Sequence, residues 1–331
     1  MSLRAAARTL AWNDGERRFR APWRLVAAGV LLSLGFLVVQ IPIIFGAVGL
    51  GLTLFEGFSA FVVISIVSVP VVVAVLWFVA RFIDRRRFDD YGLRFDRRWG
   101  TDLGFGLALG AALQATVFAV GVAAGWFRIT GVFVADGSLL AAMVGLLALF
   151  LAVGVYEELL ARGWLLTNLV EGFGFLGDRI AVACAVLISS GLFGVVHLGN
   201  PGASVLSATI ITFAGVFLAL GYVLTGELGI PIGVHISWNF FQGPVFGFGV
   251  SGITIPASVV AVEPVGPTLV TGGAFGPEGG ILGIAAVATG IVATCWWVRR
   301  RDDRLRLHPK VTEPGLRDEP DVANADTPSH R

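Results

Sequence analysis

Two adjacent carboxylates and an arginine stand inside a long apolar run of this sequence. Glu157, Glu158 and Arg162 lie in the segment that begins at Leu139 and continues to about Leu169. Charged side chains at membrane depth are costly unless they are paired or used, so such a cluster is a candidate functional site. Residues four apart share a helix face, which predicts a Glu158–Arg162 ion pair. Because neighbours on a helix point about 100° apart, we expect Glu157 to face a different partner from Glu158.

Two histidines belong to later apolar segments, and each has a partner four residues away. Phe193 precedes His197, so its ring can pack beside the imidazole, and His235 precedes Asn239 on one helix face. A carboxylate, two imidazoles and an amide can activate water and stabilise the oxyanion that forms when a peptide bond is hydrolysed. Glu157, His197 and His235 could instead hold zinc and leave one position open for water.

Each of these pairs alone has a plainer interpretation. A buried histidine often only makes hydrogen bonds, and a Glu–Arg pair often only joins helices. Trp164, Trp238 and Phe193 are typical packing residues. Cys184 and Cys295 lie in apolar runs without ligand spacing and are expected to pack as small hydrophobes. The functional hypothesis depends on the three spaced pairs occurring together.

Composition places the chain in the membrane class. Of 331 residues, 56% are hydrophobic and only 14% are charged, with a mean hydropathy of +0.81. These values predict an all-α, polytopic membrane protein with about eight transmembrane helices. The expected spans are residues 25–50, 59–82, 103–126, 139 to about 169, 180–196, 205–224, 230–250 and 281–298.

The remaining segments define the domain boundaries that we expect. Residues 1–24 form a basic arm, 25–298 a membrane domain, and 302–331 a polar tail without an apolar face, which predicts disorder. Residues 251–280 are rich in Gly and Pro, and either an ordered cap or a plain linker fits them.

The basic residues are distributed very unevenly over this topology. With the N-terminus inside, 23 of the 24 Lys and Arg residues fall on the cytoplasmic side and only Arg128 lies outside. This asymmetry predicts a multi-pass protein of the cell membrane with both termini in the cytoplasm. Residues 81–98 hold seven arginines, which indicates a juxtamembrane loop beside membrane lipid and no nucleic-acid partner.

Taken together, three motifs resemble those of the CPBP family of intramembrane endopeptidases. They are Glu157-Glu158-x-x-x-Arg162, Phe193-x-x-x-His197 and His235-x-x-x-Asn239, in this order on three apolar segments. The family comprises the CAAX prenyl proteases of type 2 (Rce1-like) and bacteriocin-processing enzymes. The segment Asp90-Tyr-Gly-Leu93 also resembles the family pattern, so the likeness covers about residues 89–242.

The resemblance implies a helical membrane fold with a cavity in the bilayer and cleavage of a peptide or protein substrate near the membrane surface. Carried over by position, Glu157 and His197 would activate water, while His235 and Asn239 would stabilise the oxyanion. Glu158 and Arg162 would be a supporting pair. Members of the family are described both as metalloproteases and as metal-free glutamate proteases, so the cofactor, zinc or none, stays open.

Two other functions fit the same residues. A proton-coupled transporter could relay protons through the buried Glu and His side chains, although the sequence shows no repeated halves of the kind that transporters commonly have. A membrane scaffold could use the polar cluster only to specify helix packing.

The order of the spans raises a difficulty for a common site. His197 comes at the outer end of the fifth span, whereas His235 lies close to the cytoplasmic start of the seventh. We therefore expect residues 198–203 to form a non-helical dip that lines the cavity, with a fifth helix that is short or begins deep. Irregular backbone is tolerated at depth where protein or water surrounds it.

Overall fold

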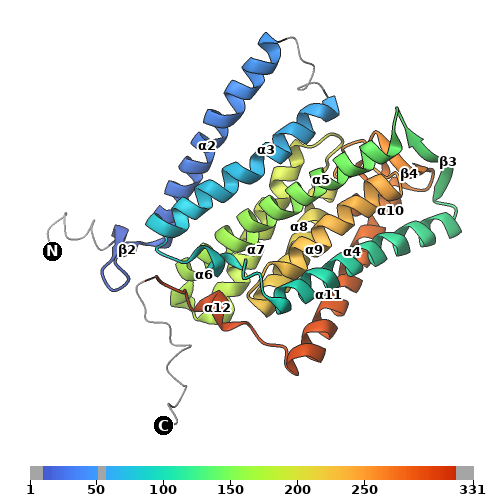
Figure 1. Cartoon of the computed structure of the whole chain (residues 1–331). Coiled ribbons are helices and arrows are strands. Elements are labelled where there is room, and N and C mark those ends of the chain that lie inside the picture. The colour runs from blue at the N-terminus through green and yellow to red at the C-terminus, as the bar shows by residue number, and fades with distance from the viewer. Residues whose placement is uncertain (1–9, 51–56, 318–331) are drawn as a thin grey trace, which may run out of the picture.

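The structure, a computed structural model, describes residues 10–50 and 57–317 and is a bundle of long helices (Figure 1). It confirms the prediction of an all-α polytopic membrane protein. Within the described residues, seven helical segments are long and apolar enough to cross a membrane. They are Ala21–Gly46, Phe61–Ile83, Arg97–Ala123, Leu139–Gly172, Asp178–Gly199, Val205–Thr225 and Ile281–Asp302.

The helices follow the apolar runs of the sequence closely. The long ones are α2 (Ala21–Gly49), α3 (Gly57–Phe78), α4 (Arg97–Ala123), α5 (Leu139–Glu158), α7 (Asp178–Val196), α8 (Val205–Thr225), α9 (Gly229–Phe240) and α11 (Ile281–Asp302). The short ones are α6 (Thr167–Gly172), α10 (Thr268–Thr271) and α12 (Pro309–Thr312). Strands β1 (Trp12–Asn13) and β2 (Arg18–Phe19) pair near the start of the chain, and β3 (Phe127–Ala135) pairs antiparallel with β4 (Ala257–Pro264).

The seventh expected span is the one that differs most from prediction. Instead of a helix over residues 230–250, α9 has 12 residues and continues as a π-helical turn, η6, over Phe241–Val245. Gly247 then takes φ of +66°, which ends the helix and turns the chain toward β4. The expectation of a full-length span here is therefore wrong, because α9 is too short to cross about 30 Å of hydrocarbon.

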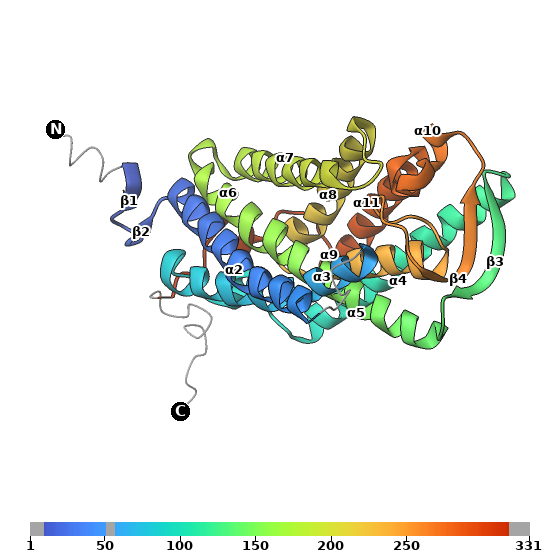
Figure 2. The same ribbon diagram turned by 90° about the horizontal axis from the view of Figure 1, so that it is seen from above.

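α9 lies in the interior of the bundle, and glycines hold it there (Figure 2). A Cβ on Gly106 of α4 would lie 2.5 Å from the carbonyl oxygen of Ile230, and one on Gly233 would lie 2.5 Å from that of Leu103. The two backbones therefore touch, as small residues allow between membrane helices. A Cβ on Gly229 would lie 2.7 Å from the Trp99 carbonyl oxygen, and one on Gly110 would lie 2.7 Å from that of Val234. These contacts advance in the same direction along both helices, so α4 and α9 run parallel.

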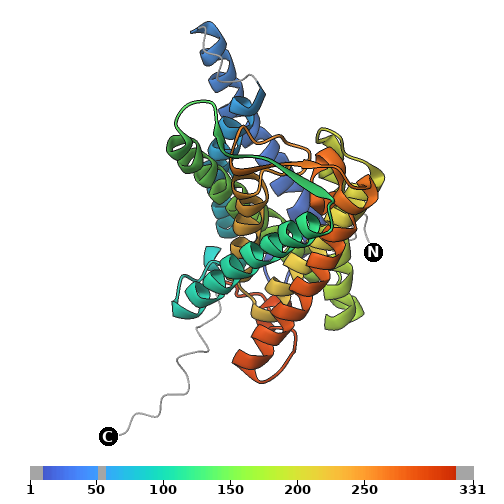
Figure 3. The ribbon, with the colours of Figure 1, turned by 90° about the vertical axis from the view of Figure 1, so that its right-hand side faces the viewer.

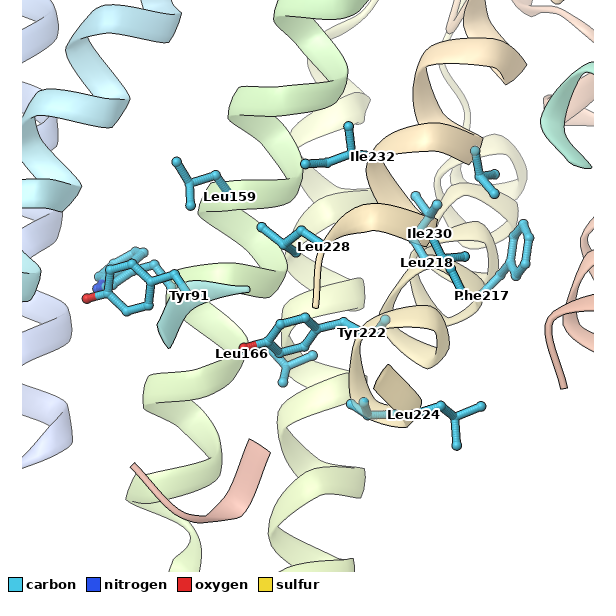
Figure 4. Packing of buried hydrophobic residues seen from close by; sticks show 14 of the residues in the cluster. Tyr91, Leu159, Leu166, Phe217, Leu218, Tyr222, Leu224, Leu228, Ile230 and Ile232 are labelled. Carbon is cyan, nitrogen blue, oxygen red and sulfur yellow. The ribbon is translucent and has the colours of Figure 1, made fainter. Parts of the chain in front are cut away.

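The core below the site is apolar and continuous. Leu159 and Leu166 pack near Leu228, at the start of α9, and near Tyr222 of α8 (Figure 4). The hydroxyl groups of Tyr222 and Thr167 are 2.9 Å apart, so these two buried groups satisfy each other. This packing fixes the level at which α9 enters the bundle.

Arginines from three segments meet one glutamate at what we call the basic end of the bundle. Arg18, Arg24 and Arg86 are buried and all contact Glu171 of α6, with 2.7 Å between Arg18 Nη2 and Glu171 Oε2. The described part of the predicted basic arm is thus docked onto the helices, and α2 already begins at Ala21.

The C-terminal segment folds back onto this same end. The amide of His308 donates to the Val223 carbonyl at 2.9 Å, Lys310 pairs with Glu227, and Val311 is buried. The prediction of disorder from residue 302 onward is therefore wrong for residues 303–317, while 318–331 lie outside the described residues. Each contact depends on a distant segment, which the local polarity of the tail could not reveal.

Candidate active site

A cavity of about 280 Å³ lies between α3, α5, α7, α8, α9 and the segment before α11. It brings together five of the seven predicted site residues from three helical segments. Glu157, Phe193, His197, His235 and Asn239 all line it. The predicted polar cavity is therefore present, and it contains the groups that the three motifs had paired.

Glu158 and Arg162 form the predicted ion pair directly beneath this cavity. Glu158 Oε1 lies 2.7 Å from Arg162 Nη1, and both side chains are fully buried. Arg162 also donates to the Gly215 carbonyl at 3.1 Å, and its guanidinium lies 4.5 Å from the centre of the Phe193 ring. A buried pair with further hydrogen bonds is stable where a lone charge would not be.

The helix changes its geometry at this pair. α5 ends at Glu158 and continues as a π-helical stretch, η3, over Leu159–Leu166, which contains Arg162. A π-helical insertion inside an α-helix is rare and often marks a functional site.

His235 contacts both adjacent carboxylates. Its Nδ1 lies 2.7 Å from Glu158 Oε1, and its Nε2 lies 3.8 Å from Glu157 Oε2. The expectation that Glu157 and Glu158 must face different partners is therefore wrong. An imidazole has a nitrogen on each of two edges, so the His235 ring, which comes from α9, can contact Glu158 with one nitrogen and Glu157 with the other. Because a carboxylate oxygen accepts, we assign the proton of the Glu158 contact to Nδ1, and Nε2 is the atom that faces Glu157.

His197 is oriented by the residue that precedes it by four. Its Nδ1 lies 2.6 Å from the Phe193 carbonyl oxygen, which orients Nε2 as the second, unbound edge of the ring. The centre of the Phe193 ring lies 4.7 Å from that of the His197 ring and 6.1 Å from that of the His235 ring, so Phe193 packs beside the His197 imidazole as predicted. Among the described residues, no ion pair joins His197 to Glu157, and the imidazole nearest to Glu157 is that of His235.

The two histidines reach one cavity because α9, and not the fifth helix, begins deep. His235 lies about 9 Å along α9, whereas Phe193, which contacts it, lies about 22 Å along α7 at 1.5 Å per residue. The fifth helix is full-length, so the expectation that it is short is wrong. The expected non-helical dip is present, because a 3₁₀ turn at His197–Gly199 leads into irregular backbone and Asn200 lines the cavity.

Two polar groups of the site can still form hydrogen bonds with a bound molecule. Glu157 Oε1 accepts from the Tyr156 hydroxyl at 3.2 Å, while its Oε2 is buried and has no hydrogen-bond partner within the described chain. The carboxamide of Asn239 lines the cavity and is hydrogen-bonded to none of the described residues. A buried oxygen without a donor is costly, so Glu157 is suited to receive a proton from a molecule bound in the cavity.

Sequence reasoning missed Glu278, a buried acid of the Gly- and Pro-rich segment. Glu278 lines the cavity and accepts hydrogen bonds from the backbone and hydroxyl of Ser251 and from the indole of Trp238 at 3.2 Å. Burial raises the pKa of Glu278, whereas these bonds and His197 lower it. A single acid among glycines gave no spacing signal that could have identified it.

The segment from residue 251 to 280 is an ordered cap, which decides between the two alternatives. Gln242 Nε2 donates to the Gly249 carbonyl at 2.7 Å, and Gln114 holds Gln242 in turn at 2.9 Å. In Figure 3 the cap, in orange, lies at the end of the bundle opposite the last turns of α11, in red. Its residues Ser251, Ile253, Ile255 and Glu278 line the cavity.

The described residues do not fit a zinc site. Zinc needs three or four His, Cys or carboxylate ligands that converge at about 2.0–2.3 Å, and no group of three such side chains in the described chain is arranged to hold a metal. Of the proposed ligands, His235 already gives one nitrogen to Glu158.

Comparison with known families agrees with this geometry. Residues 139–241 match the family model described as type II CAAX prenyl endopeptidase, Rce1-like. This segment belongs to the Rce1-like family. The Rce1-like segment includes all seven predicted site residues and ends before the cap, so the family resemblance seen in the motifs is confirmed.

The Rce1-like family is one of membrane endopeptidases, and the apolar helices make this chain a multi-pass integral membrane protein. Comparisons with curated proteins and with solved structures found no match.

Proposed function

We propose that this protein is an intramembrane endopeptidase that hydrolyses a peptide bond in a membrane-associated or lipidated peptide or protein. The observation that carries the proposal is Glu157 Oε2, which accepts no hydrogen bond from the described residues and faces a cavity shared with two imidazoles and the amide of Asn239. We further propose that it acts in the cell membrane, with both termini in the cytoplasm.

In this mechanism Glu157 is the general base. Its carboxylate takes a proton from a water molecule as the water oxygen attacks the carbonyl carbon of the scissile bond. The C–N bond of the tetrahedral intermediate then breaks and the carbonyl group re-forms. The leaving amine takes up a proton, and His197 is the second group that transfers protons in this step. Both residues line the cavity, and the His197 nitrogen that is not bound to Phe193 is available for this transfer.

The oxyanion would be stabilised from α9. Asn239 can donate its amide N–H groups, and protonated His235 can donate from Nε2 while Nδ1 remains bound to Glu158. Preorganised donors in a site that excludes water are worth far more than the same donors in water. Arg162 and Glu158 support this arrangement because they fix the His235 ring.

The test is cleavage by purified protein in liposomes. Glu157→Gln and His197→Ala should abolish cleavage of a lipidated reporter peptide while the proteins are still produced and folded. Glu263→Gln is the matched control, because Glu263 is exposed on β4 and only pairs with Arg128 at the surface. Unchanged turnover in Glu157→Gln would exclude the mechanism, and a non-lipidated peptide of the same sequence shows whether the lipid is required.

A further inference from the structure

The cap reaches the cavity through a tight two-residue turn. Val250 and Ile253 exchange backbone hydrogen bonds of 3.0 and 2.8 Å, and the residues between them, Ser251 and Gly252, both have positive φ, +48° and +81°. Such turns favour Gly at these positions, so Ser251 is held in a conformation that costs free energy. A Cβ at Gly252 would overlap the carbonyl oxygen of Pro201, so the turn presses on the segment that follows His197.

Glu278 fastens this strained turn. One carboxylate oxygen accepts from both the backbone N–H and the hydroxyl of Ser251, the latter at 2.9 Å, while the other accepts from Trp238 Nε1 at 3.2 Å. Hydrogen bonds to a carboxylate are about twice as strong as neutral ones. Trp238 is the residue before Asn239, so one buried side chain links the cap to the helix that carries the amide of the site.

Glu278 also faces the reacting groups across the cavity. It lines the same cavity as Glu157 and His197. Burying a carboxylate costs several kcal/mol unless its oxygens are satisfied, and here they are. A plain surface loop would need no such group, and the cap lies outside the Rce1-like segment, so the family match does not explain it.

We propose that Glu278 is a positioning residue of the active site, which clamps the Val250–Ile253 turn as the wall that closes the cavity. The proposal rests on the proposed peptidase function. In this arrangement the scissile peptide lies between the turn and α9, with Val250 and Ile253 forming the apolar part of the wall. Loss of the clamp leaves the water-activating groups intact but lets the wall move, so fewer substrates are held in a reactive geometry.

The experiment compares Glu278→Gln with Glu263→Gln, which alters an acid of the same segment that is exposed. Glu278→Gln can still accept from Ser251, but it loses the charge and presents an amide to Trp238. We expect kcat for the lipidated reporter to fall on the order of tenfold, as for a lost hydrogen bond to a charged group, with thermal stability close to that of the control. Hydrogen exchange at residues 250–253 should become faster.

A second variant tests the Glu278 clamp with a change that should not disturb folding. Ser251→Gly removes only the hydroxyl bond and suits the positive φ, so it should fold well and show a smaller fall in kcat. Because both changes act through one clamp, the double variant should be no worse than Glu278→Gln alone.

Two results would overturn the clamp. One is a Glu278→Gln enzyme with the kcat and KM of Glu263→Gln while Glu157→Gln is inactive. The other is unchanged hydrogen exchange at 250–253, which can be measured even if the wild-type protein cleaves nothing. Absence of cleavage in the wild type would instead count against the proposed function.

Discussion

At the scale of single residues, Glu157 and Glu158 show how surroundings separate two identical side chains. Glu158 is fully buried and shared by Arg162 and His235, so its charge is compensated. Glu157 keeps one oxygen without a partner. The first is therefore suited to hold the site together, and the second is suited to chemistry.

The Arg162→Met variant tests this division. Removal of the guanidinium leaves Glu158 with only His235, and breaking a buried pair from one side typically costs about 3–5 kcal/mol. We expect a large drop in melting temperature in detergent for Arg162→Met, measured by differential scanning fluorimetry. Glu157→Gln should melt close to the wild type. Similar melting of all three proteins would show that the pair has no structural role.

At the scale of elements, the depth of α9 decides which groups meet. The apolar runs were enough to predict seven of the long helices, and spacing by four predicted the Glu158–Arg162 pair. The contact of His235 with both carboxylates could not be predicted in this way, because it depends on where α9 starts relative to α5. That level is set by contacts between helices, such as Gly106 against Ile230, which no local pattern encodes.

Glycine variants of α4 test how closely the site depends on this contact. Gly106→Ala would force a methyl group against the α9 backbone, where overpacking typically costs about 1–3 kcal/mol. We expect lower thermal stability and lower cleavage, because His235 would shift with α9. Gly104→Ala is the matched control on the same helix, since a Cβ there meets nothing within 4 Å. Equal behaviour of the two variants would exclude tight packing of α4 on α9.

At the scale of the whole molecule, the two ends of the bundle differ in character. The basic end gathers the N-terminal hairpin, Glu171 and the C-terminal segment, whereas the cap closes the other end. The parallel course of α4 and α9 fits an even number of passes, and the first and last described segments both lie at the basic end although α9 is short. This architecture was only partly predictable, because the tail binds surfaces that form on folding.

Reporter fusions test the proposed orientation. A phosphatase that is active only outside the cell should be inactive when fused after residue 317 and active when inserted at Phe133, an exposed residue of β3. A cytoplasmic reporter should give the opposite pattern. Activity of the phosphatase at the C-terminal fusion would reverse the topology.

Acid should loosen the C-terminal segment through His308. Burial, followed by Lys310 and Arg98, lowers the pKa of His308 from 6.5 to about 4, although Asp302 opposes this. Between pH 4 and pH 6.5 the released segment therefore binds more protons than the docked segment. Docking is complete above about pH 6.5 and weakens as the pH falls toward 4. Glu227, whose pKa is raised by burial, acts in the opposite direction.

Hydrogen exchange at residues 308–316 measures this release. It should be faster at pH 5 than at pH 7, after correction for the intrinsic rate, and His308→Gln should lose that contribution. The same pH dependence in both proteins would assign the effect to Glu227 or another group.

The shortness of α9 also bears on how the protein is made. A helix of 12 residues cannot settle alone in a bilayer that requires about 20, and its slot beside α4 and α5 exists only after those helices have docked. Insertion of α9 therefore depends on α4 and α5, which precede it in the chain, so the side chains around His235 come together only once α9 has docked between them.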